Sequence, residues 1–213
     1  MKSVIIGAGT YGEVYLVYLQ DAGIEVVGFL DDNKDLYGKQ MLGCPVLGGT
    51  NMLPVLREKC EVEAIYCPIG NNKLRVEFLS QARSLGYETP NFIHKLAFVS
   101  PNVRMGNNGV YVLPNTLIMP HVVLDDYVMV SVGANIAHHS HLSLGVFVST
   151  GVNLGASLVA EKYAYIGMGS TVMTGVKVLG ENCLIGAGAV VIKDVPANAI
   201  VAGVPAKVLR YKQ

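Results

Sequence analysis

The feature that most constrains the fold is a six-residue repeat that begins near Val112 and continues towards the C-terminus. Neither an α-helix, which repeats every 3.6 residues, nor a half-buried strand, which repeats every two, explains this period. Positions two residues before the repeated ones, from Val110 to Val176, are also small or aliphatic. The repeated positions themselves are all aliphatic or alanine: Val112, Ile118, Leu124, Val130, Ile136, Leu142, Val148, Leu154, Ala160, Ile166, Val172 and Val178.

This pattern predicts a parallel β-helix, in which each hexad is one short strand with a turn and three hexads form one triangular coil. We expect the array to run from Val99 to about Val191, with an imperfect lead-in at Ser100–Asn108. Near Val178 the aliphatic–glycine pairs come one residue late, which predicts a small bulge. With about 18 residues per coil, residues 112–191 give roughly four to five coils around one continuous core.

The composition allows a well-packed chain and excludes several classes of partner. A length of 213 residues fits one large domain or two small ones, and 51% hydrophobic against 15% charged residues argues against disorder. Sixteen basic residues balance sixteen acidic ones, so nothing indicates a nucleic-acid partner. No apolar run approaches the roughly 20 residues of a membrane helix, and the start MKSVIIGAG is not a signal peptide. We expect a soluble cytoplasmic protein with no membrane partner.

The first residues read as a βαβ unit that carries a glycine-rich turn. Lys2–Ile6 is an expected strand, followed by Gly7-Ala8-Gly9-Thr10-Tyr11-Gly12 and a helix through about Gln20. A second strand, Ile24–Leu30, leads into Asp31-Asp32-Asn33. This is the GxGxxG fingerprint with an acidic residue about 20 positions later. Glycines there let backbone N–H groups at a helix N-terminus approach a phosphate, which predicts a nucleotide or nucleotide-sugar site. A purely structural turn is the alternative.

An NAD-dependent enzyme is disfavoured, because a dinucleotide fold needs two βαβ halves and the repeat begins before a second half is complete. A third strand is expected within Cys60–Pro68, followed by Ile69-Gly70-Asn71-Asn72 and a helix near Lys73–Leu85. Gly43–Gly49 and Tyr87–Lys95 read as loops. The fold class is therefore a Rossmann-like α/β domain over residues 1–95, followed by a β-helix domain over residues 96–213.

The C-terminal segment DVPANAIVAGVPAKVLR, from Asp194 to Arg210, together with the hexads resembles the left-handed β-helix acyltransferases. The N-terminal GAGTYG, FLDDN and IGNN segments narrow this resemblance. The whole chain resembles the bacterial sugar acetyltransferases that include nucleotide-4-amino-sugar N-acetyltransferases and sialic-acid O-acetyltransferases. The resemblance implies a homotrimer that holds acetyl-CoA along the prism between neighbouring subunits and a nucleotide-linked amino sugar on the N-terminal domain.

Acetyl transfer from a thioester needs a base and donors for the oxyanion, and histidine suits the base role near neutral pH. In the family that the chain resembles, the base is a histidine two positions after the core aliphatic residue. Here that position is His138, after Ile136. The family often follows it with an acidic residue that orients the imidazole, and this chain has His139 instead. Solvated surface, trimer packing and a zinc site are the alternatives for this cluster, but no carboxylate or thiol completes a zinc set.

Counting one coil onwards from His138 gives Ala156, whose backbone N–H should lie about one strand spacing away as an oxyanion donor. Gly155 would let a thioester approach, and Thr174 lies in line one coil further, so the ridge 156–174 is a predicted pantetheine path. Lys207, in the Gly-Val-Pro-Ala-Lys segment, is assigned to the coenzyme as well. Relatives often carry a second histidine where this chain has Phe147.

On the N-terminal side, the resemblance assigns the nucleotide-sugar to the glycine-rich loop and two strand ends. The family usually has a histidine where this chain has Tyr11, but the backbone role of the glycines survives. The candidate substrate-binding residues are Gly7, Gly9, Thr10, Tyr11, Gly12, Asp31, Asp32, Asn71 and Asn72. The preferred hypothesis is a metal-independent, acetyl-CoA-dependent N-acetyltransferase acting on a nucleotide-linked 4-amino-4,6-dideoxy sugar for surface polysaccharide or glycan synthesis. The alternatives are a sialic-acid-type O-acetyltransferase and a non-catalytic trimeric sensor.

Overall fold

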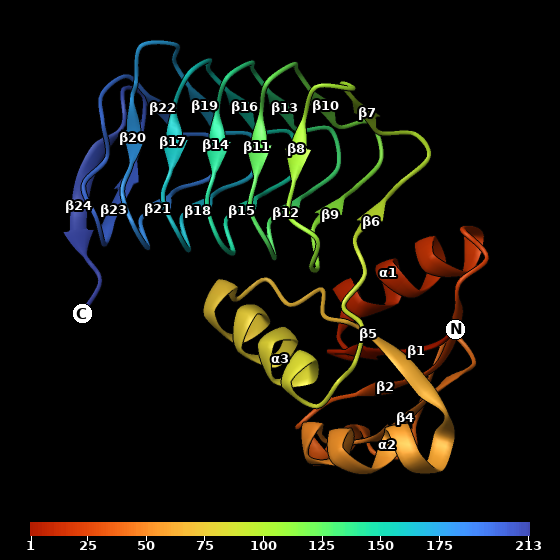
Figure 1. The fold of residues 1–213 in the computed structure, drawn as a ribbon. Coiled ribbons are helices and arrows are strands. Elements are labelled where there is room, and N and C mark those ends of the chain that lie inside the picture. The colour runs from red at the N-terminus through yellow and green to blue at the C-terminus, as the bar shows by residue number, and fades with distance from the viewer. The chain divides into compact units, whose positions relative to one another are not determined.

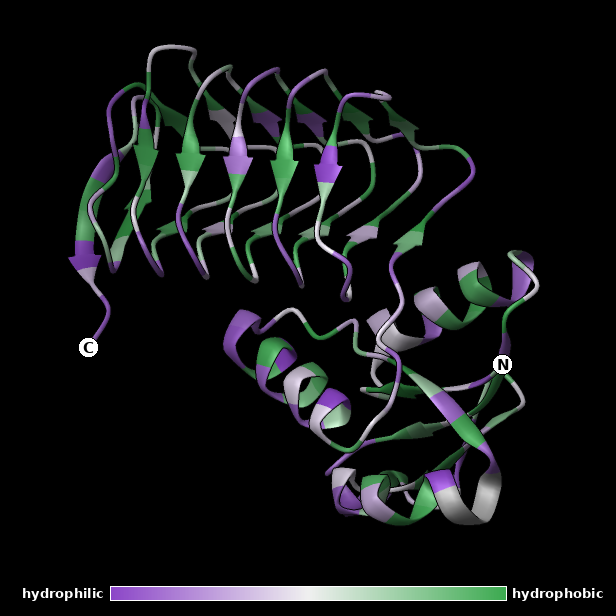
Figure 2. Ribbon diagram, in the orientation of Figure 1, coloured by the Kyte–Doolittle hydropathy of each residue, from purple (hydrophilic) through white to green (hydrophobic). Residues whose placement is uncertain are grey.

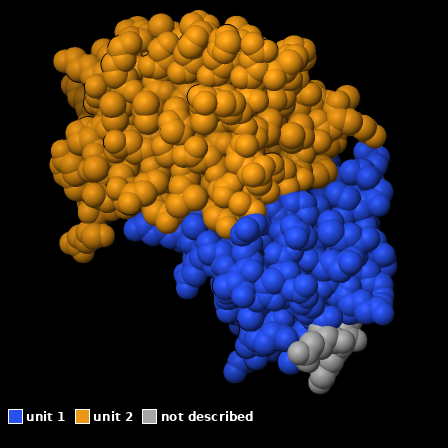
Figure 3. All heavy atoms as spheres, viewed as in Figure 1, with its two compact units in different colours: residues 1–90 blue, residues 91–213 orange. Residues whose placement is uncertain are grey.

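Two compact units, Met1–Pro90 and Asn91–Gln213, make up the computed structural model of this chain (Figures 1 and 3). Side chains are described for residues 1–57 and 61–213. Within those ranges, no helix has both the length and the apolar character needed to cross a bilayer.

The first unit is a mainly parallel five-stranded sheet with the strand order β3-β4-β2-β1-β5. Strands β4, β2, β1 and β5 are parallel, and β3 runs antiparallel to β4. Val4, Ile5 and Ile6 are buried in β1, the near-continuous apolar run expected of a central parallel strand. In chain order the elements are β1 (Lys2–Ile6), α1 (Thr10–Asp21), β2 (Glu25–Leu30), η1 (Lys34–Leu36), β3 (Gln40–Met41), β4 (Cys44–Gly48), η2 (Thr50–Met52), α2 (Leu53–Cys60), β5 (Val62–Tyr66) and α3 (Asn72–Ser84).

The three expected strands and two expected helices of this unit are confirmed, but the expectation of a loop at Gly43–Gly49 is wrong. That segment contains β4, which pairs in parallel with β2. Cys44 and Val46 are buried on alternate positions, so β4 has the period of a strand. Pro45 and the surrounding glycines concealed that alternation in the sequence.

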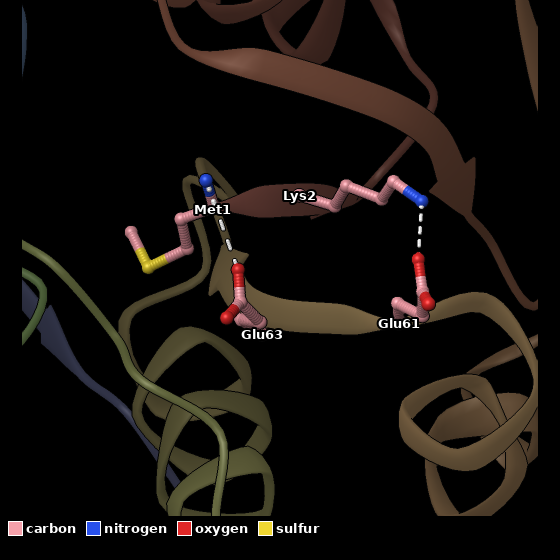
Figure 4. A network of polar contacts seen from close by, with 4 residues as sticks. All are labelled: Met1, Lys2, Glu61 and Glu63. Atoms are coloured by element: carbon pink, nitrogen blue, oxygen red, sulfur yellow. Dashed lines mark hydrogen bonds and ion pairs between the residues drawn. The ribbon is translucent and has the colours of Figure 1, made fainter.

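Two ion pairs lie at the opposite end of the sheet from the glycine-rich turn, where β1 and β5 begin. The Met1 amino group lies 3.7 Å from a Glu63 carboxylate oxygen, and Lys2 Nζ lies 2.8 Å from Glu61 Oε2 (Figure 4). The hydrogen bond and the charge of Lys2 lower the pKa of Glu61 below its ordinary value. Because these groups are solvent-exposed, the pairs contribute little to stability.

The second unit is a left-handed parallel β-helix with three faces, built from short strands stacked one coil above another. Figure 2 shows hydrophobic residues in most of these strands. The six-stranded face consists of β7 (Phe98–Val99), β10 (Leu117–Ile118), β13 (Asn135–Ile136), β16 (Asn153–Leu154), β19 (Thr171–Val172) and β22 (Val190–Val191). The five-stranded face consists of β8 (Arg104–Met105), β11 (Val123–Leu124), β14 (His141–Leu142), β17 (Val159–Ala160) and β20 (Val178–Leu179).

The eight-stranded face begins before Val99, the residue at which the array was expected to start. Its strands are β6 (Phe92–Ile93), β9 (Tyr111–Val112), β12 (Met129–Val130), β15 (Phe147–Val148), β18 (Tyr165–Ile166), β21 (Leu184–Ile185), β23 (Ala199–Ala202) and β24 (Lys207–Tyr211). The unit boundary falls after Pro90 because β6 already pairs in parallel with β9. Asn91 supports this first layer, donating to the Gly106 carbonyl at 2.7 Å and accepting from the Val110 N–H at 2.9 Å. The expectation of a loop over Tyr87–Lys95 is therefore wrong at Phe92–Ile93.

The predicted core of the prism is confirmed. Val112 and its successors at six-residue intervals are buried through Val172, and the residues two positions before them are buried as well. The next core residue is Leu179, not Val178, so the interval there is seven residues. The extra residue forms a bulge, with an isolated bridge between Thr174 and Val176 and a positive φ of 108° at Gly175. The chain ends in a turn over 203–206 and the antiparallel strand β24.

Positive-φ residues stack in three columns at the corners of the prism, with at most one residue of each column in a coil. The column between the six-stranded and five-stranded faces, which we call the histidine corner, consists of His121, His139, Ser157 and Gly175. The other two columns consist of Asn115, Gly133, Gly151, Gly169 and Gly188, and of Gly109, Tyr127, Gly145, Tyr163, Asn182 and Asn198. A positive φ turns the chain sharply between two faces, at a cost for most residues other than glycine and asparagine.

Candidate active site

In the first unit, the candidate site lies at the carboxyl ends of β1 and β5. From β1 the chain passes to β2 on one side, and it later returns to β5 on the other side of β1. Ligands of open α/β sheets bind at such a reversal of strand order. Two loops meet there, because a Cβ on Gly7 would lie 3.1 Å from Cγ1 of Ile69.

The three glycines of the turn have different reasons for being glycine. Gly7 has a φ of +103°, and a Cβ on the buried Gly12 would collide with the Gly7 carbonyl oxygen. Gly9 has an ordinary φ of −77°, and a Cβ there would meet no atom within 4 Å. The chain's own packing therefore requires Gly7 and Gly12 but not Gly9. Gly9 is the N-cap of α1, a position that itself favours glycine over alanine, and its backbone is open.

The helix α1 begins at Thr10, with Gly9 at its N-cap, and no described side chain caps it. Thr10 is exposed, and the ring of Tyr11 lies edge-on to Tyr15 with centroids 5.4 Å apart. The first-turn N–H groups of a helix have no partner within the helix, and a phosphate is a group that satisfies them.

The two aspartates after β2 bind the chain's own backbone. Asp31 accepts hydrogen bonds from the N–H groups of Ala8 and Asn33, both at 2.9 Å. Asp32 accepts from the Thr50 N–H at 2.7 Å and from the Thr50 hydroxyl at 2.9 Å. Asp31 therefore holds the glycine-rich turn against the end of β2, and Asp32 holds the end of β4. Both carboxylates shape the site through these loops.

The side-chain oxygens of Asn71 and Asn72 also accept hydrogen bonds from groups of this chain. Asn71 is the N-cap of α3 and accepts from the N–H groups of Lys73 and Leu74 at 3.1 and 3.2 Å. Asn72 is buried and accepts from Arg75 Nη1 at 3.1 Å, while the same nitrogen donates to the Ile69 carbonyl at 2.8 Å. The fully buried Arg75 guanidinium thus fixes the loop at 69–72 from behind.

In the second unit, His138 and His139 form an exposed pair at the histidine corner. Their Nδ1 atoms are 3.0 Å apart, and their rings are nearly perpendicular with centroids 5.1 Å apart. His141 does not join this pair, because its Nε2 lies 3.0 Å from Asp125 Oδ1. The structure therefore separates the three histidines of this hexad into one imidazole pair and one histidine–carboxylate pair.

Ala156 lies one coil beyond His138, and the stacking is direct there because the Ser157 N–H donates to the His138 carbonyl at 3.0 Å. The N–H of Ala156 donates to the Thr174 hydroxyl at 3.3 Å, which is long for a hydrogen bond. We expected Gly155 to be a glycine so that a thioester could approach, but the packing of the prism also requires a glycine there. A Cβ on Gly155 would lie 2.5 Å from the Thr174 backbone nitrogen, so the stacking of the next coil requires this glycine.

Lys207 is exposed at the start of β24, in the last layer of the eight-stranded face. That layer lies four coils beyond the coil of His138, or roughly 19 Å along the prism at about 4.8 Å per coil. Lys207 is therefore separate from the His138 pair and lies at the end of the same prism.

Buried thiols contribute no nucleophile. Burial raises the pKa of Cys67 and of Cys183 to about 12 and raises that of Cys44, so these thiols stay protonated near neutral pH. Among residues 1–57 and 61–213, no group of three or more His, Cys, Asp or Glu side chains is placed to hold a metal ion.

The sequence reasoning missed three parts of these sites. His121 stacks on His139, and counting back 18 residues from position 139 would have found it. Asp125 faces His141 from the neighbouring coil, a contact that the strand period also allows. Thr50 was missed because β4 was expected to be a loop.

Comparison with known proteins extends these observations. Residues 2–82 match the family described as the PglD N-terminal domain. The chain is 32% identical to perosamine N-acetyltransferase from Caulobacter crescentus, solved as a histidine-to-asparagine variant with CoA and GDP-perosamine. That alignment covers 99% of this chain and 97% of that one, with a TM-score of 0.92.

The acetyltransferase domain of PglB from Neisseria gonorrhoeae FA1090, solved with acetyl coenzyme A, is 30% identical, and the alignment covers 98% of each chain with a TM-score of 0.78. Galactoside O-acetyltransferase of Escherichia coli (strain K12) is 34% identical over 96 residues, which cover 45% of this chain. The chain spans only 41% of the length of that curated relative and still less of the next two.

Proposed function

The chain belongs to the hexapeptide-repeat, left-handed β-helix family of bacterial sugar acetyltransferases, and from this premise we propose that it acetylates the 4-amino group of a nucleotide-linked 4-amino-4,6-dideoxy sugar. The acetyl donor is acetyl-CoA. The observation that carries this proposal is the similarity, over both units, to an enzyme solved with CoA and GDP-perosamine. The alternative of sugar O-acetylation has weaker support, because the O-acetyltransferase relative matches less than half of the chain.

His138 is the general base, and His139 orients it. One proton occupies the bond between the two Nδ1 atoms when both rings are neutral. If His138 donates that proton, His139 accepts it with its own proton on Nε2, and the lone pair of His138 lies on Nε2. His139 thus performs, as a neutral acceptor, the orienting task of the acidic residue found in relatives.

The reaction is a direct transfer without an acyl-enzyme. The sugar amine attacks the thioester carbonyl, and His138 Nε2 takes a proton from the amine nitrogen as the new C–N bond forms. The C–S bond then breaks, and the proton passes from His138 to the departing CoA sulfur. The Ala156 N–H stabilises the oxyanion once the thioester oxygen has replaced the Thr174 hydroxyl as its acceptor.

The first unit holds the nucleotide part of the acceptor. The phosphate groups bind the first-turn N–H groups of α1, from Thr10 to Gly12, with the open backbone at Gly9 allowing close approach. Tyr11 and the loop from Ile69 to Asn72 border the same strand ends. Asp31 and Asp32 act by holding these loops.

The remaining proposals concern assembly and coenzyme. The enzyme is a cytoplasmic homotrimer in which the pantetheine follows the ridge from Ala156 to Thr174 and Lys207 meets the phosphate end of the coenzyme. The roughly 19 Å between the coils of His138 and Lys207 suits an extended coenzyme. Acetylation of a nucleotide sugar prepares it for surface polysaccharide or glycan synthesis.

A thiol-release assay tests the function. The full chain is incubated with acetyl-CoA and with GDP-, UDP- and dTDP-linked 4-amino-4,6-dideoxy sugars, sialic acid, or galactosides. We expect free CoA and an N-acetylated product with at least one nucleotide amino sugar. Product with hydroxyl acceptors alone would establish the O-acetyltransferase alternative, and binding without turnover would favour a sensor.

A further inference from the structure

Beside the His138–His139 pair, the histidine corner holds the imidazole of His121, which has no part in the mechanism above. The His121 and His139 rings have centroids 4.7 Å apart and a tilt of 38°. Both residues occupy the positive-φ position of their coils, with φ values of 63° and 58°. Their ring separation equals the rise between stacked strands, so the prism itself sets this stack.

We propose that His121 is a positioning residue for the catalytic base, which it serves by holding the His139 ring as the acceptor of the His138 Nδ1–H. This inference rests on the proposed acetyl transfer. The His139 backbone is anchored by its N–H to the Pro120 carbonyl at 3.3 Å, but the ring itself is exposed. The stacked ring of His121 restricts rotation of the His139 side chain. On the other side of the column, Ser157 is too small to stack.

The His139 ring needs the support of His121 because position 139 holds a histidine where relatives often have an acidic residue. A carboxylate accepts a hydrogen bond through either of two oxygens, whereas an imidazole accepts through one nitrogen in one ring orientation. If the His139 ring turns away, His138 loses the partner that keeps its proton on Nδ1. Its proton is then free to move to Nε2, which removes the lone pair needed by the base.

The test compares His121→Ala, which removes the stack, with His121→Phe, which keeps a ring without ionisable nitrogen. Asn115→Ala is the matched control, because Asn115 is exposed and has a positive φ in another corner column. Since misplacement of a catalytic group costs up to about 100-fold, we expect His121→Ala to lower kcat about tenfold. The KM values for acetyl-CoA and for the sugar should change by less than about twofold, as expected for a loss confined to the chemical step. His121→Phe should restore most of kcat, and the control should match the wild type.

Nitrogen-15 NMR of the imidazoles gives a readout that does not depend on turnover. We expect the wild type and His121→Phe to carry the His138 proton on Nδ1 and the His139 proton on Nε2, and His121→Ala to lose this preference. Unchanged tautomers and unchanged kcat in His121→Ala would overturn the proposal, as would a loss in His121→Phe as large as in His121→Ala. If no acceptor is acetylated, the proposed function fails, and the NMR result alone decides whether His121 positions His139.

Discussion

The glycine-rich turn of the first unit and the histidine corner of the second use backbone and side chains in opposite ways: one leaves backbone open, and the other leaves side chains exposed. At the turn, the polar side chains Asp31, Asp32 and Asn71 bind the chain's own backbone, and the backbone at Gly9, where we propose that the phosphates bind, is open. At the corner, the backbone is engaged by neighbouring coils, and the side chains of His138 and His139 are exposed.

This difference follows from the two architectures. The strands of a parallel sheet end in loops whose N–H groups need hydrogen-bond partners. Nearby polar side chains accept from some of these N–H groups, and a phosphate can accept from the others. A β-helix satisfies its backbone coil by coil, so chemistry there depends on side chains at the corners. Substitutions should therefore affect binding and stability at the turn, and the rate of the chemical step at the corner.

The largest effect is expected for His138→Asn. Loss of the general base should lower kcat by roughly 10² to 10⁴-fold, because positioned proton transfer contributes about that much. The melting temperature should stay within error, since the side chain is exposed. Steady-state kinetics measure kcat, and thermal denaturation measures the melting temperature. Full turnover in this variant would show that His138 is not the general base.

His139→Ala should lower kcat by about 10- to 100-fold, since the base loses its orienting partner but not its imidazole. His139→Asp should keep most of the activity and move the acid limb of the pH–rate profile upwards, because a carboxylate stabilises the protonated His138. An acid limb at the same pH in both proteins would contradict the orienting role.

At the turn, Gly9→Ala and Gly12→Ala should separate binding from stability. Gly9→Ala should raise KM for the nucleotide sugar about tenfold, as expected for the proposed close approach of the ligand, and should lower stability by only about 0.5–1 kcal/mol, because Gly9 is an N-cap and its Cβ would meet no protein atom within 4 Å. Gly12→Ala should destabilise the first unit by about 1–3 kcal/mol, since its Cβ meets the Gly7 carbonyl. A larger loss of stability in Gly9→Ala than in Gly12→Ala, with an unchanged KM, would show that Gly9 has a structural role.

Asp31→Asn leaves one acceptor oxygen for two backbone donors. We expect a loss of about 1–2 kcal/mol in the free energy of unfolding, as for a hydrogen bond to a charged group. Urea denaturation followed by circular dichroism measures this, with the exposed Asp35→Asn as the control. An equal, small effect of both variants would mean that Asp31 does not brace the turn.

The smallest effect is expected at the ion pair of Lys2 and Glu61. Because the pKa of Glu61 is lowered in the folded state, its contribution to stability is present above the ordinary value of 4.5 and is lost as the pH falls below it. Glu61→Gln should therefore be slightly less stable than the wild type at pH 7 and equally stable near pH 3. A difference that persists at pH 3 would mean that the charge of Glu61 is not its cause.

Period and burial made most of the fold predictable. The hexads located the core from Val112 to Val172, and the late aliphatic–glycine pair at Leu179 revealed the bulge. The first layer was not predictable, because the Asn91 side chain, and not a repeated aliphatic residue, supports it by donating one hydrogen bond to Gly106 and accepting one from Val110. Strand β4 was missed because Pro45 and its flanking glycines carry a stronger turn signal than two alternating buried residues.

For the candidate sites, spacing predicted which positions align but not how polar groups pair. Counting by coils placed Ala156 next to His138 and Thr174 in line with it, but not the hydrogen bond from the Ala156 N–H to the Thr174 hydroxyl. Likewise, the sequence named the aspartates after β2 but not their backbone partners. Hydrogen-bond partners depend on differences of a few tenths of an ångström between atoms, and a repeat in the sequence does not determine such distances.

The positive φ of His121 and His139 has a consequence for the balance between stability and activity. A residue other than glycine or asparagine costs about 1–2 kcal/mol in this conformation. At a neighbouring corner the same coils use glycine at positions 133 and 151, where no such cost arises. A search for thermostable variants would therefore favour glycine or asparagine at 121 and 139, and the same substitutions would remove the imidazoles that we propose orient the base. Selection for heat resistance and selection for turnover pull these two positions in opposite directions.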